Sequence, residues 1–296
     1  MHSCAMRLNL AFLALLLSNV AARAAAPTPA EIVAHAPDSA WETVAPERLL
    51  LMTMADGGRA VIELAPDFAP VHVANVVRLA RAHAWDRGAI TRVQDNYVVQ
   101  WRVRDGKTAS PKGFVEQPPA EYDRPLDGLA FRPLGYPDPY APQAGLVAGW
   151  AAGSDGARVW PAQCYGTVGV GREMPPDTGD GRELYVINGE APRQLDRNLA
   201  VVGRVLVGME YFGALRRGTG ALGFYTDEHQ DIPIKNMTLA ADLPQVARPH
   251  VQTMRTDSPT FGAYLDARAA RTDQFFVRAA HGVALCNVPV PSREVR

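Results

Sequence analysis

A permanently charged hydrogen-bond donor and an amide lie close together in a segment that otherwise has the composition of β-strands. The segment is TRVQDNYVVQWRV, residues 91–103, and the two groups are Arg92 and Gln100. With QDN (94–96) as a hairpin turn, Arg92 lies opposite Val98 and is a diagonal neighbour of Gln100 on one face. A guanidinium fixed beside apolar surface can stabilise a charge or lone pair that develops in a transition state. An exposed sheet face with ordinary polar residues is the alternative interpretation.

Other residues that could do chemistry form weaker patterns. DTGDGRE (177–183) lacks the alternating ligands of a calcium loop, and GTVGVG (166–171) lacks the spacing of a dinucleotide fingerprint. Ser154 has no nearby base, and the histidines are scattered along the chain. A net charge of -1 argues against a nucleic-acid partner. We therefore expect neither a metal nor a cofactor.

The elements that must position Arg92 are short strands and a few helices. The run RLLLMTMADGGRAVIEL (48–64) predicts two strands joined by a tight turn at Asp56-Gly57-Gly58. Apolar residues at 73, 76, 77 and 80 share one face of a helix predicted over 71–82, with Pro70 in its first turn. One such helix among many short strands indicates an antiparallel barrel or sandwich. The further strand-like runs are YGTVGVG (165–171), ELYVING (183–189), NLAVVGRVLVG (198–208) and IPIKNMTLA (232–240).

The N-terminus has the features of a secretory signal peptide, residues 1–24. Arg7 precedes an apolar run that is shorter than the ~20 residues of a membrane-spanning helix, and Ala22-Arg23-Ala24 fits a cleavage site. Cleavage would leave no stable membrane insertion; retention as an uncleaved anchor is the alternative. Cys164 and Cys286 remain after cleavage, and in an oxidising compartment they form either a disulfide or two separate buried thiols.

Three further segments differ in composition from the strand-rich region. Residues 25–46 form a leader without a strong period. Residues 104–160 are an insertion rich in Gly, Pro and Asp that is expected to be irregular. Residues 246–296 form a C-terminal extension with a helix that begins after Ser258, and we expect this extension to pack on the main domain.

The order of the motifs resembles the cyclophilin family of peptidyl-prolyl cis-trans isomerases. VIELAPDFAPVHVANVVRLARAHAW (61–85) followed by ITRVQDNYVVQ (90–100) resembles the family's strand, helix and arginine-bearing strand. The later segments resemble its remaining motifs in the right order, and together the motifs are specific. The resemblance covers about residues 48–240, and we expect the domain over 47–245. The resemblance implies a mainly β fold: a closed eight-stranded antiparallel barrel capped by two helices, with the site on its outer face. The later segments are GTVGVGR (166–172), ELYVINGEAPRQLDRNLAVVGRVLVGME (183–210) and IPIKNMTLA (232–240).

The resemblance also implies an activity and a set of site residues. The substrate would be a proline-containing polypeptide, whose X–Pro bond rotates over a barrier of ~18–20 kcal/mol because of its partial double-bond character. Arg92 would donate to the prolyl nitrogen of the twisted amide, and Gln100 would hold Arg92 or a substrate carbonyl. No nucleophile, metal or cofactor is needed. The implied substrate-binding residues are Tyr97, Val98, Gly171, Arg172, Tyr185, Gln194, Leu195 and Leu199.

Several of these positions depart from the family pattern. Tyr185 takes the place of a pocket phenylalanine, Leu199 replaces a histidine or tyrosine, and Gln194 falls where many members carry an aromatic residue. Gly171-Arg172 replaces an Ala-Asn pair, and Glu183 falls where a glutamine is common. These departures leave Arg92 intact but alter the pocket. A catalytically weak or inactive peptide-binding or chaperone module is therefore the alternative function.

The interpretation favoured by the sequence is an exported, periplasmic prolyl isomerase that assists the folding of exported proteins. We expect it to act as a monomer on polypeptide clients. An interaction role, in which the C-terminal helix docks a partner, is a further alternative.

Overall fold

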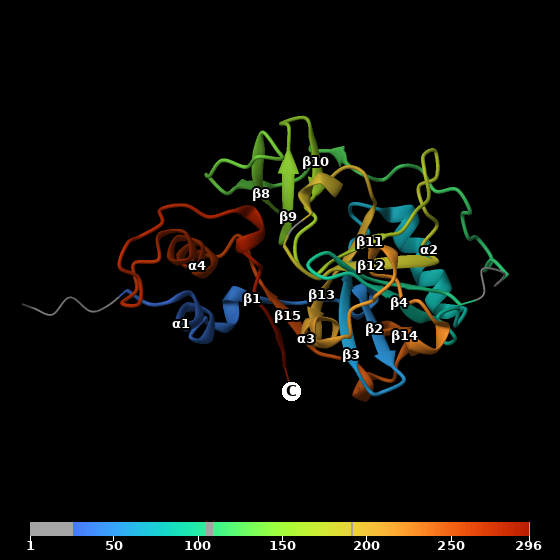
Figure 1. Ribbon diagram of the computed structural model, residues 1–296. Helices are drawn as coiled ribbons and strands as arrows, with labels where there is room; N and C mark the ends of the chain where they lie inside the picture. The colour runs from blue at the N-terminus through green and yellow to red at the C-terminus, as the bar shows by residue number, and fades with distance from the viewer. Residues whose placement is uncertain (1–25, 105–108, 191, 296) are drawn as a thin grey trace, which may run out of the picture.

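The computed structural model describes residues 26–104, 109–190 and 192–295, so the expected signal peptide lies outside the described residues. The largest unit is a closed antiparallel barrel of eight strands in the order β11-β12-β5-β4-β14-β2-β3-β13 (Figure 1). The predicted fold class is therefore confirmed. The barrel strands are β2 (Leu49–Met54), β3 (Arg59–Leu64), β4 (Ala89–Val93), β5 (Val98–Arg102), β11 (Thr167–Val170), β12 (Glu183–Ile187), β13 (Val201–Val207) and β14 (Ile232–Leu239).

Two helices pack on the barrel and share its core, as expected. The first, α2 (Pro70–Arg81), is displaced by one residue from its predicted bounds and buries Val73, Val76 and Leu79. The second, α3 (Met209–Ala214), stacks Phe212 on Trp101 of β5, with ring centroids 5.9 Å apart. Alternate residues of each strand point into this core, so the residues between them point outward. A site built on strands must therefore lie on the outer face.

Glu121, which precedes the strands of the insertion 104–160, lies at the N-terminal end of α2. The carboxylate of Glu121 accepts hydrogen bonds from the N–H of Val71 at 3.0 Å and of His72 at 3.0 Å, and lies 2.7 Å from Nδ1 of the buried His72. Burial raises the pKa of Glu121, but the bonds from His72 and Val71 outweigh it and hold the pKa below its ordinary value. A carboxylate therefore caps this helix from outside its own sequence.

The insertion contains regular structure, which corrects the expectation that residues 104–160 are irregular. It forms an antiparallel sheet in the order β6-β10-β9-β8-β7, beside the barrel (Figure 1). Three of these short strands contain a proline and the other two contain a glycine, and the segment around them is rich in Gly, Pro and Asp, so no strand pattern stands out. The strands are β6 (Arg124–Pro125), β7 (Phe131–Pro133), β8 (Gln143–Val147), β9 (Trp150–Ser154) and β10 (Arg158–Pro161).

The two ends of the described residues fold together, and regular structure begins at Pro29, within the leader in which the sequence showed no strong period. The leader forms α1 (Pro29–Ala34) and β1 (Trp41–Thr43). β1 pairs with β15 (Val251–Met254), which pairs with β16 (Ser292–Glu294). α4 (Pro259–Ala270) begins where the sequence predicts, with Oγ of Ser258 accepting from the N–H of Phe261. Among the described residues, no helix is long and apolar enough to cross a membrane.

A second apolar core joins the inserted sheet to both ends of the chain. The C-terminal extension thus packs on α1 and the inserted sheet, and it reaches the barrel through Val251 of β15, which is buried with Leu49 and Leu51 of β2, and through β16. There Oγ of Ser292 donates to the carbonyl of Leu206 at 2.8 Å. The buried members of this core include Trp41, Leu146, Phe261, Tyr264 and Leu285.

Cys164 and Cys286 form a disulfide at the edge of this second core. Their Cα atoms are 5.1 Å apart although the residues are 122 positions apart in the sequence. The bond links the segment before β11 to the C-terminal extension. Of the two alternatives that the sequence left open, the structure has the bonded pair.

Candidate active site

Four strands of the barrel present one row of outward-facing residues. Arg92 of β4 lies opposite Gln100 of β5, and Gln100 lies opposite Tyr185 of β12. Tyr185 lies in turn opposite Gly169 of β11. Opposed residues of neighbouring antiparallel strands point to the same side of the sheet. A cation, an amide and a phenol ring therefore come side by side on the outer face.

Arg92 and Gln100 are direct partners, whereas the predicted register made them diagonal neighbours. The N–H of Gln94 donates to the carbonyl of Val98 at 2.9 Å, so the hairpin loop comprises residues 95–97 instead of 94–96. Its middle residue is an asparagine with a φ of 52°, a left-handed conformation that asparagine tolerates better than most residues. The shift of the loop by one residue moves the pairing by two, so both side chains stay on the predicted face.

Three hydrogen bonds hold the Arg92 guanidinium. Nε donates to the carbonyl of Leu222 at 2.7 Å, and Nη1 donates to Oε1 of Gln100 at 3.0 Å. Nη2 donates to Oε1 of Gln94. A guanidinium has five N–H donors. Counted over the described residues, one N–H on each terminal nitrogen is left for a ligand.

Residues 218–225, which supply the Leu222 carbonyl, lie along β4 although they are far from it in the sequence. Two backbone hydrogen bonds from these residues to β4, at 2.9 and 3.0 Å, align them with the strand. Aromatic rings flank the guanidinium carbon of Arg92, with the centroid of Phe224 at 5.1 Å and that of Tyr97 at 5.6 Å. Burial lowers the pKa of Arg92, but arginine titrates so far above neutrality that the group stays charged. The guanidinium is thus an oriented cation with little freedom to turn.

A pocket of about 120 Å³ opens beside Arg92. The structure brings nine of the ten residues selected from the sequence to its wall. Gln194 is the exception, because its side chain is exposed to solvent and does not line the pocket. The lining residues are Arg92, Tyr97, Val98, Gln100, Gly171, Arg172, Tyr185, Leu195 and Leu199.

The floor of this pocket is apolar. Val98 and Tyr185 are buried there, with Tyr97 and Leu199 packed against them. The hydroxyl of Tyr185 donates to Oε1 of Gln163 at 3.1 Å, and burial raises the pKa of that hydroxyl. The phenol therefore stays neutral, with its polar end satisfied beneath the pocket. The floor is suited to a small apolar ring.

A buried ion network holds the segment that supplies Leu195 and Leu199. Nη1 of Arg193 lies 2.9 Å from Oδ2 of Asp138, and Nε lies 2.6 Å from Oδ2 of Asp196. Burial raises the pKa of Asp196, with Arg193 acting in the opposite direction. Because Asp138 belongs to the insertion, the insertion helps to place one wall of the pocket.

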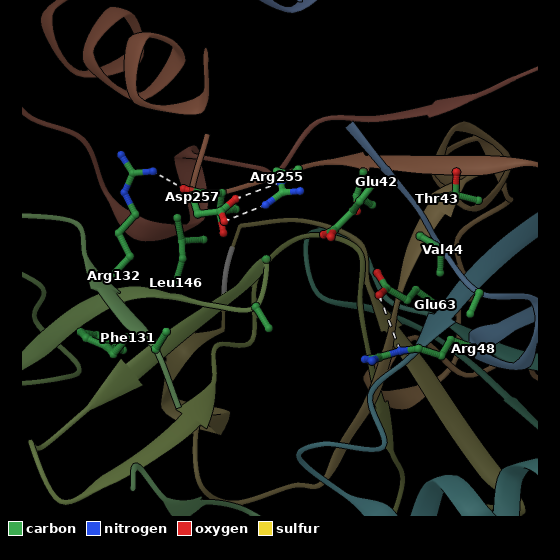
Figure 2. A pocket seen from close by; sticks show the side chains of 16 residues that line it. Glu42, Thr43, Val44, Arg48, Glu63, Phe131, Arg132, Leu146, Arg255 and Asp257 are labelled. Atoms are coloured by element: carbon green, nitrogen blue, oxygen red, sulfur yellow. Dashed lines mark hydrogen bonds and ion pairs between the residues drawn. The ribbon is translucent and has the colours of Figure 1, made fainter. Parts of the chain in front are cut away.

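A larger cleft, of about 510 Å³, lies where the barrel, the inserted sheet and the C-terminal segment meet (Figure 2). It shares no lining residue with the smaller pocket. Figure 2 shows Arg255 and Asp257 facing each other at its rim, where their charged groups are 3.0 Å apart. Arg48 is likewise paired with Asp67 at 3.0 Å. Among the described residues no cluster of three or more His, Cys, Asp or Glu side chains is suited to a metal.

The row of Arg92, Gln100 and Tyr185 and the apolar pocket beside it lie on the outer face of a closed barrel. The family model described as cyclophilin type peptidyl-prolyl cis-trans isomerase/CLD matches residues 49–240, which include every barrel strand. The chain belongs to the cyclophilin family. Its enzyme class is therefore that of the peptidyl-prolyl cis-trans isomerases.

Two curated relatives and one solved structure are similar to this cyclophilin. Probable peptidyl-prolyl cis-trans isomerases of Brucella suis biovar 1 and Brucella melitensis biotype 1 are each 28% identical over 177 residues, which is 60% of this chain and 75% of the relative. The crystal structure of cyclophilin AquaCyp293 from Hirschia baltica has a TM-score of 0.68 and 23% identity, and covers 90% of this chain and 97% of that one. The likeness of fold thus extends over more of the chain than residues 49–240.

Several residues of the cyclophilin site were missed by sequence reasoning. Leu222 and Phe224 contact Arg92 from a segment that carries no pattern pointing to β4. Gln94 was placed in the turn, so its bond to Arg92 was not foreseen. Glu183 stood out only as a departure from the family, yet it accepts a hydrogen bond from Nε2 of Gln100. The signal available in the sequence was Glu183 itself, a charged residue at the start of an otherwise apolar strand.

Proposed function

We propose that this cyclophilin isomerises X–Pro bonds of polypeptides and that Arg92 donates a hydrogen bond to the prolyl nitrogen of the twisted amide. The proposal is carried by the oriented guanidinium beside an apolar pocket of about 120 Å³. Twisting the X–Pro bond breaks amide conjugation and localises a lone pair on the nitrogen. A fixed donor binds that twisted state better than the planar one, which lowers the barrier.

The remaining pocket residues have a holding role in this proposal. Val98, Tyr185 and Leu199 clamp the proline ring, while the chain before it rotates. The bonds from Arg92 to Leu222 and Gln100 are formed before the substrate arrives. The donor therefore needs no reorganisation during the reaction, which is the source of its advantage over water.

We further propose that the clients are exported polypeptides and that the protein acts as a monomer in the periplasm. The signal-like residues 1–24 support export. The disulfide between Cys164 and Cys286 suits an oxidising compartment. Fractionation of cells that express the full chain tests this: recovery in the cytoplasm with residues 1–24 retained would contradict it.

The catalytic proposal is tested by following cis-to-trans exchange of short X–Pro peptides with residues 25–296. Arg92→Ala should lower kcat/KM by about 10²–10³-fold, the usual effect of removing one preorganised donor. Arg92→Lys should recover little, because one ammonium cannot keep both the Leu222 and the Gln100 bonds. Arg87→Ala, which removes an exposed arginine of the same barrel, is the matched control. If the unaltered protein accelerates no peptide across several X residues, the binding-module alternative replaces catalysis.

A further inference from the structure

Gln100 is bonded on its two sides by groups of opposite hydrogen-bonding character. Its Oε1 accepts from Nη1 of Arg92 at 3.0 Å, and its Nε2 donates to Oε1 of Glu183. Glu183 stands on β12 opposite Arg102, one diagonal step from Gln100. It does not line the pocket. The hydrogen bonds of its side chain among the described residues lead to the pocket through Gln100 and Arg92.

These two partners leave the Gln100 amide with a single satisfied orientation. A guanidinium offers only donors, and an ionised carboxylate offers only acceptors. Turning the amide over would set its NH₂ against the N–H groups of Arg92 and its oxygen against the oxygen of Glu183. Both bonds would be lost at once. A neutral amide at position 183 would both donate and accept, so it would tolerate either orientation.

We propose that Glu183, as a carboxylate, is a positioning residue that orients the Gln100 amide and thereby keeps the Arg92 guanidinium aligned with the pocket. This inference rests on the proposed role of Arg92. It adds a third group to the bonded pair of Arg92 and Gln100, one that neither lines the pocket nor makes a hydrogen bond to the guanidinium. A charged carboxylate at position 183 fixes the orientation of the Gln100 amide, which a glutamine at that position would not do.

The charged groups that face Glu183 come from three elements. Burial has the largest influence and raises the pKa of Glu183. Arg102 of β5 and Arg92 of β4 favour the carboxylate, whereas Glu173, from the segment after β11, opposes it. Gly171 in that segment leaves space for the side chain, because a Cβ there would stand 3.0 Å from Cγ of Glu183. The carboxylate is thus close-packed and becomes protonated at a higher pH than an exposed one.

Protonation of Glu183 should loosen the arrangement, because the carboxyl group then gains a donor. For the unaltered protein, kcat/KM should fall as the pH is lowered from about 7.5 through the pKa of Glu183, which burial raises above its ordinary value of 4.5. Glu183→Gln should be slower at pH 7.5 and should show little of that pH dependence. The loss at pH 7.5 should be about 3- to 10-fold, the equivalent of one neutral hydrogen bond. The measurement is peptide exchange at each pH, with folding checked by circular dichroism.

Two further variants make the result decisive. Glu173→Gln removes the same charge from the neighbourhood without a bond to Gln100. It should keep the unaltered rate at about pH 7.5 and a pH-dependent profile, whose midpoint moves slightly to lower pH because Glu173 raises the pKa of Glu183. Glu183→Asp keeps the charge but shortens the side chain, so it should lose rate while retaining a pH-dependent profile. A Glu183→Gln protein with the unaltered rate and pH profile overturns the inference, as does an equal loss in Glu173→Gln. An active Arg92→Ala protein instead overturns the proposed function, so the two failures are distinguishable.

Discussion

Tyr185 and Gly169 lie directly opposite each other on β12 and β11, and the Tyr185 ring occupies the space that a side chain at position 169 would fill. A Cβ on Gly169 would overlap the Tyr185 hydroxyl. That hydroxyl reaches Gln163 only because the facing position is empty. Glycine in a strand interior often marks such a close approach. The pocket floor therefore depends on a residue that has no side chain.

Gly169→Ala should displace Tyr185 and damage the pocket. Overpacking a filled site costs about 1–3 kcal/mol, so the free energy of unfolding should fall by that amount. The KM for an X–Pro peptide should rise because the ring moves into the pocket. Urea unfolding and peptide kinetics measure the two effects. Gly213→Ala in α3, whose added Cβ meets no atom within 4 Å, is the control and should not destabilise the protein. Equal stability of the two variants would contradict the packing argument.

Removal of the disulfide should destabilise the fold more than it slows catalysis. The bond between Cys164 and Cys286 closes a loop of 122 positions, and such cross-links typically contribute about 2–4 kcal/mol. Neither cysteine belongs to the barrel core. The double Cys→Ser variant should thus unfold at lower urea concentration while its kcat/KM at low temperature changes little. The unaltered protein in reductant should match it. Unchanged urea midpoints in both samples would refute the prediction.

Asp138→Ala should weaken the wall of the pocket from a distance. Its carboxylate is buried and paired with Arg193 at 2.9 Å, and breaking a buried pair costs about 3–5 kcal/mol. Arg193 keeps its bond to Asp196, so we expect the lower end of that range. Because this network holds Leu195 and Leu199, KM should rise as well. Asp127→Ala, at an exposed position of the same insertion, should change neither quantity. A rise in KM in both variants would point to the insertion as a whole.

Glu183→Gln should stabilise the protein at neutral pH although it slows catalysis. The folded-state pKa of Glu183 is raised above its ordinary value of 4.5, so the native state binds this proton more tightly than the unfolded chain. Stability from this group is therefore lost as the pH rises from about 4.5 through the folded pKa. The variant lacks that loss. The difference in urea midpoint between variant and unaltered protein should be small near pH 4.5 and grow toward pH 7. A constant difference would exclude the burial of charge as its cause.

The strands, the helix at α2 and the shared face of Arg92 and Gln100 followed from local sequence, whereas the outward direction of that face was implied by the family resemblance. A strand that buries one face must alternate along the chain, and a helix on the barrel must repeat its apolar residues every three to four positions. Such periods are properties of neighbouring residues, so they can be read without a structure. The order of the motifs then indicated nine of the pocket residues, because the family keeps that order. The strands of the insertion were missed because each contains a proline or a glycine and lies in a segment rich in Gly, Pro and Asp, which is typical of loops.

Only the tertiary structure decided which distant groups meet. The Leu222 carbonyl reaches Arg92 across 130 positions, and Cys164 meets Cys286 across 122. Whether Arg92 pairs with Val98 or with Gln100 depended on which three residues formed the hairpin loop. The bond from Gln100 to Glu183 depended in turn on the pairing of β5 with β12. The physical reason is common to the three long-range contacts: they are selected by packing of the whole chain, which leaves no periodic trace in the local sequence.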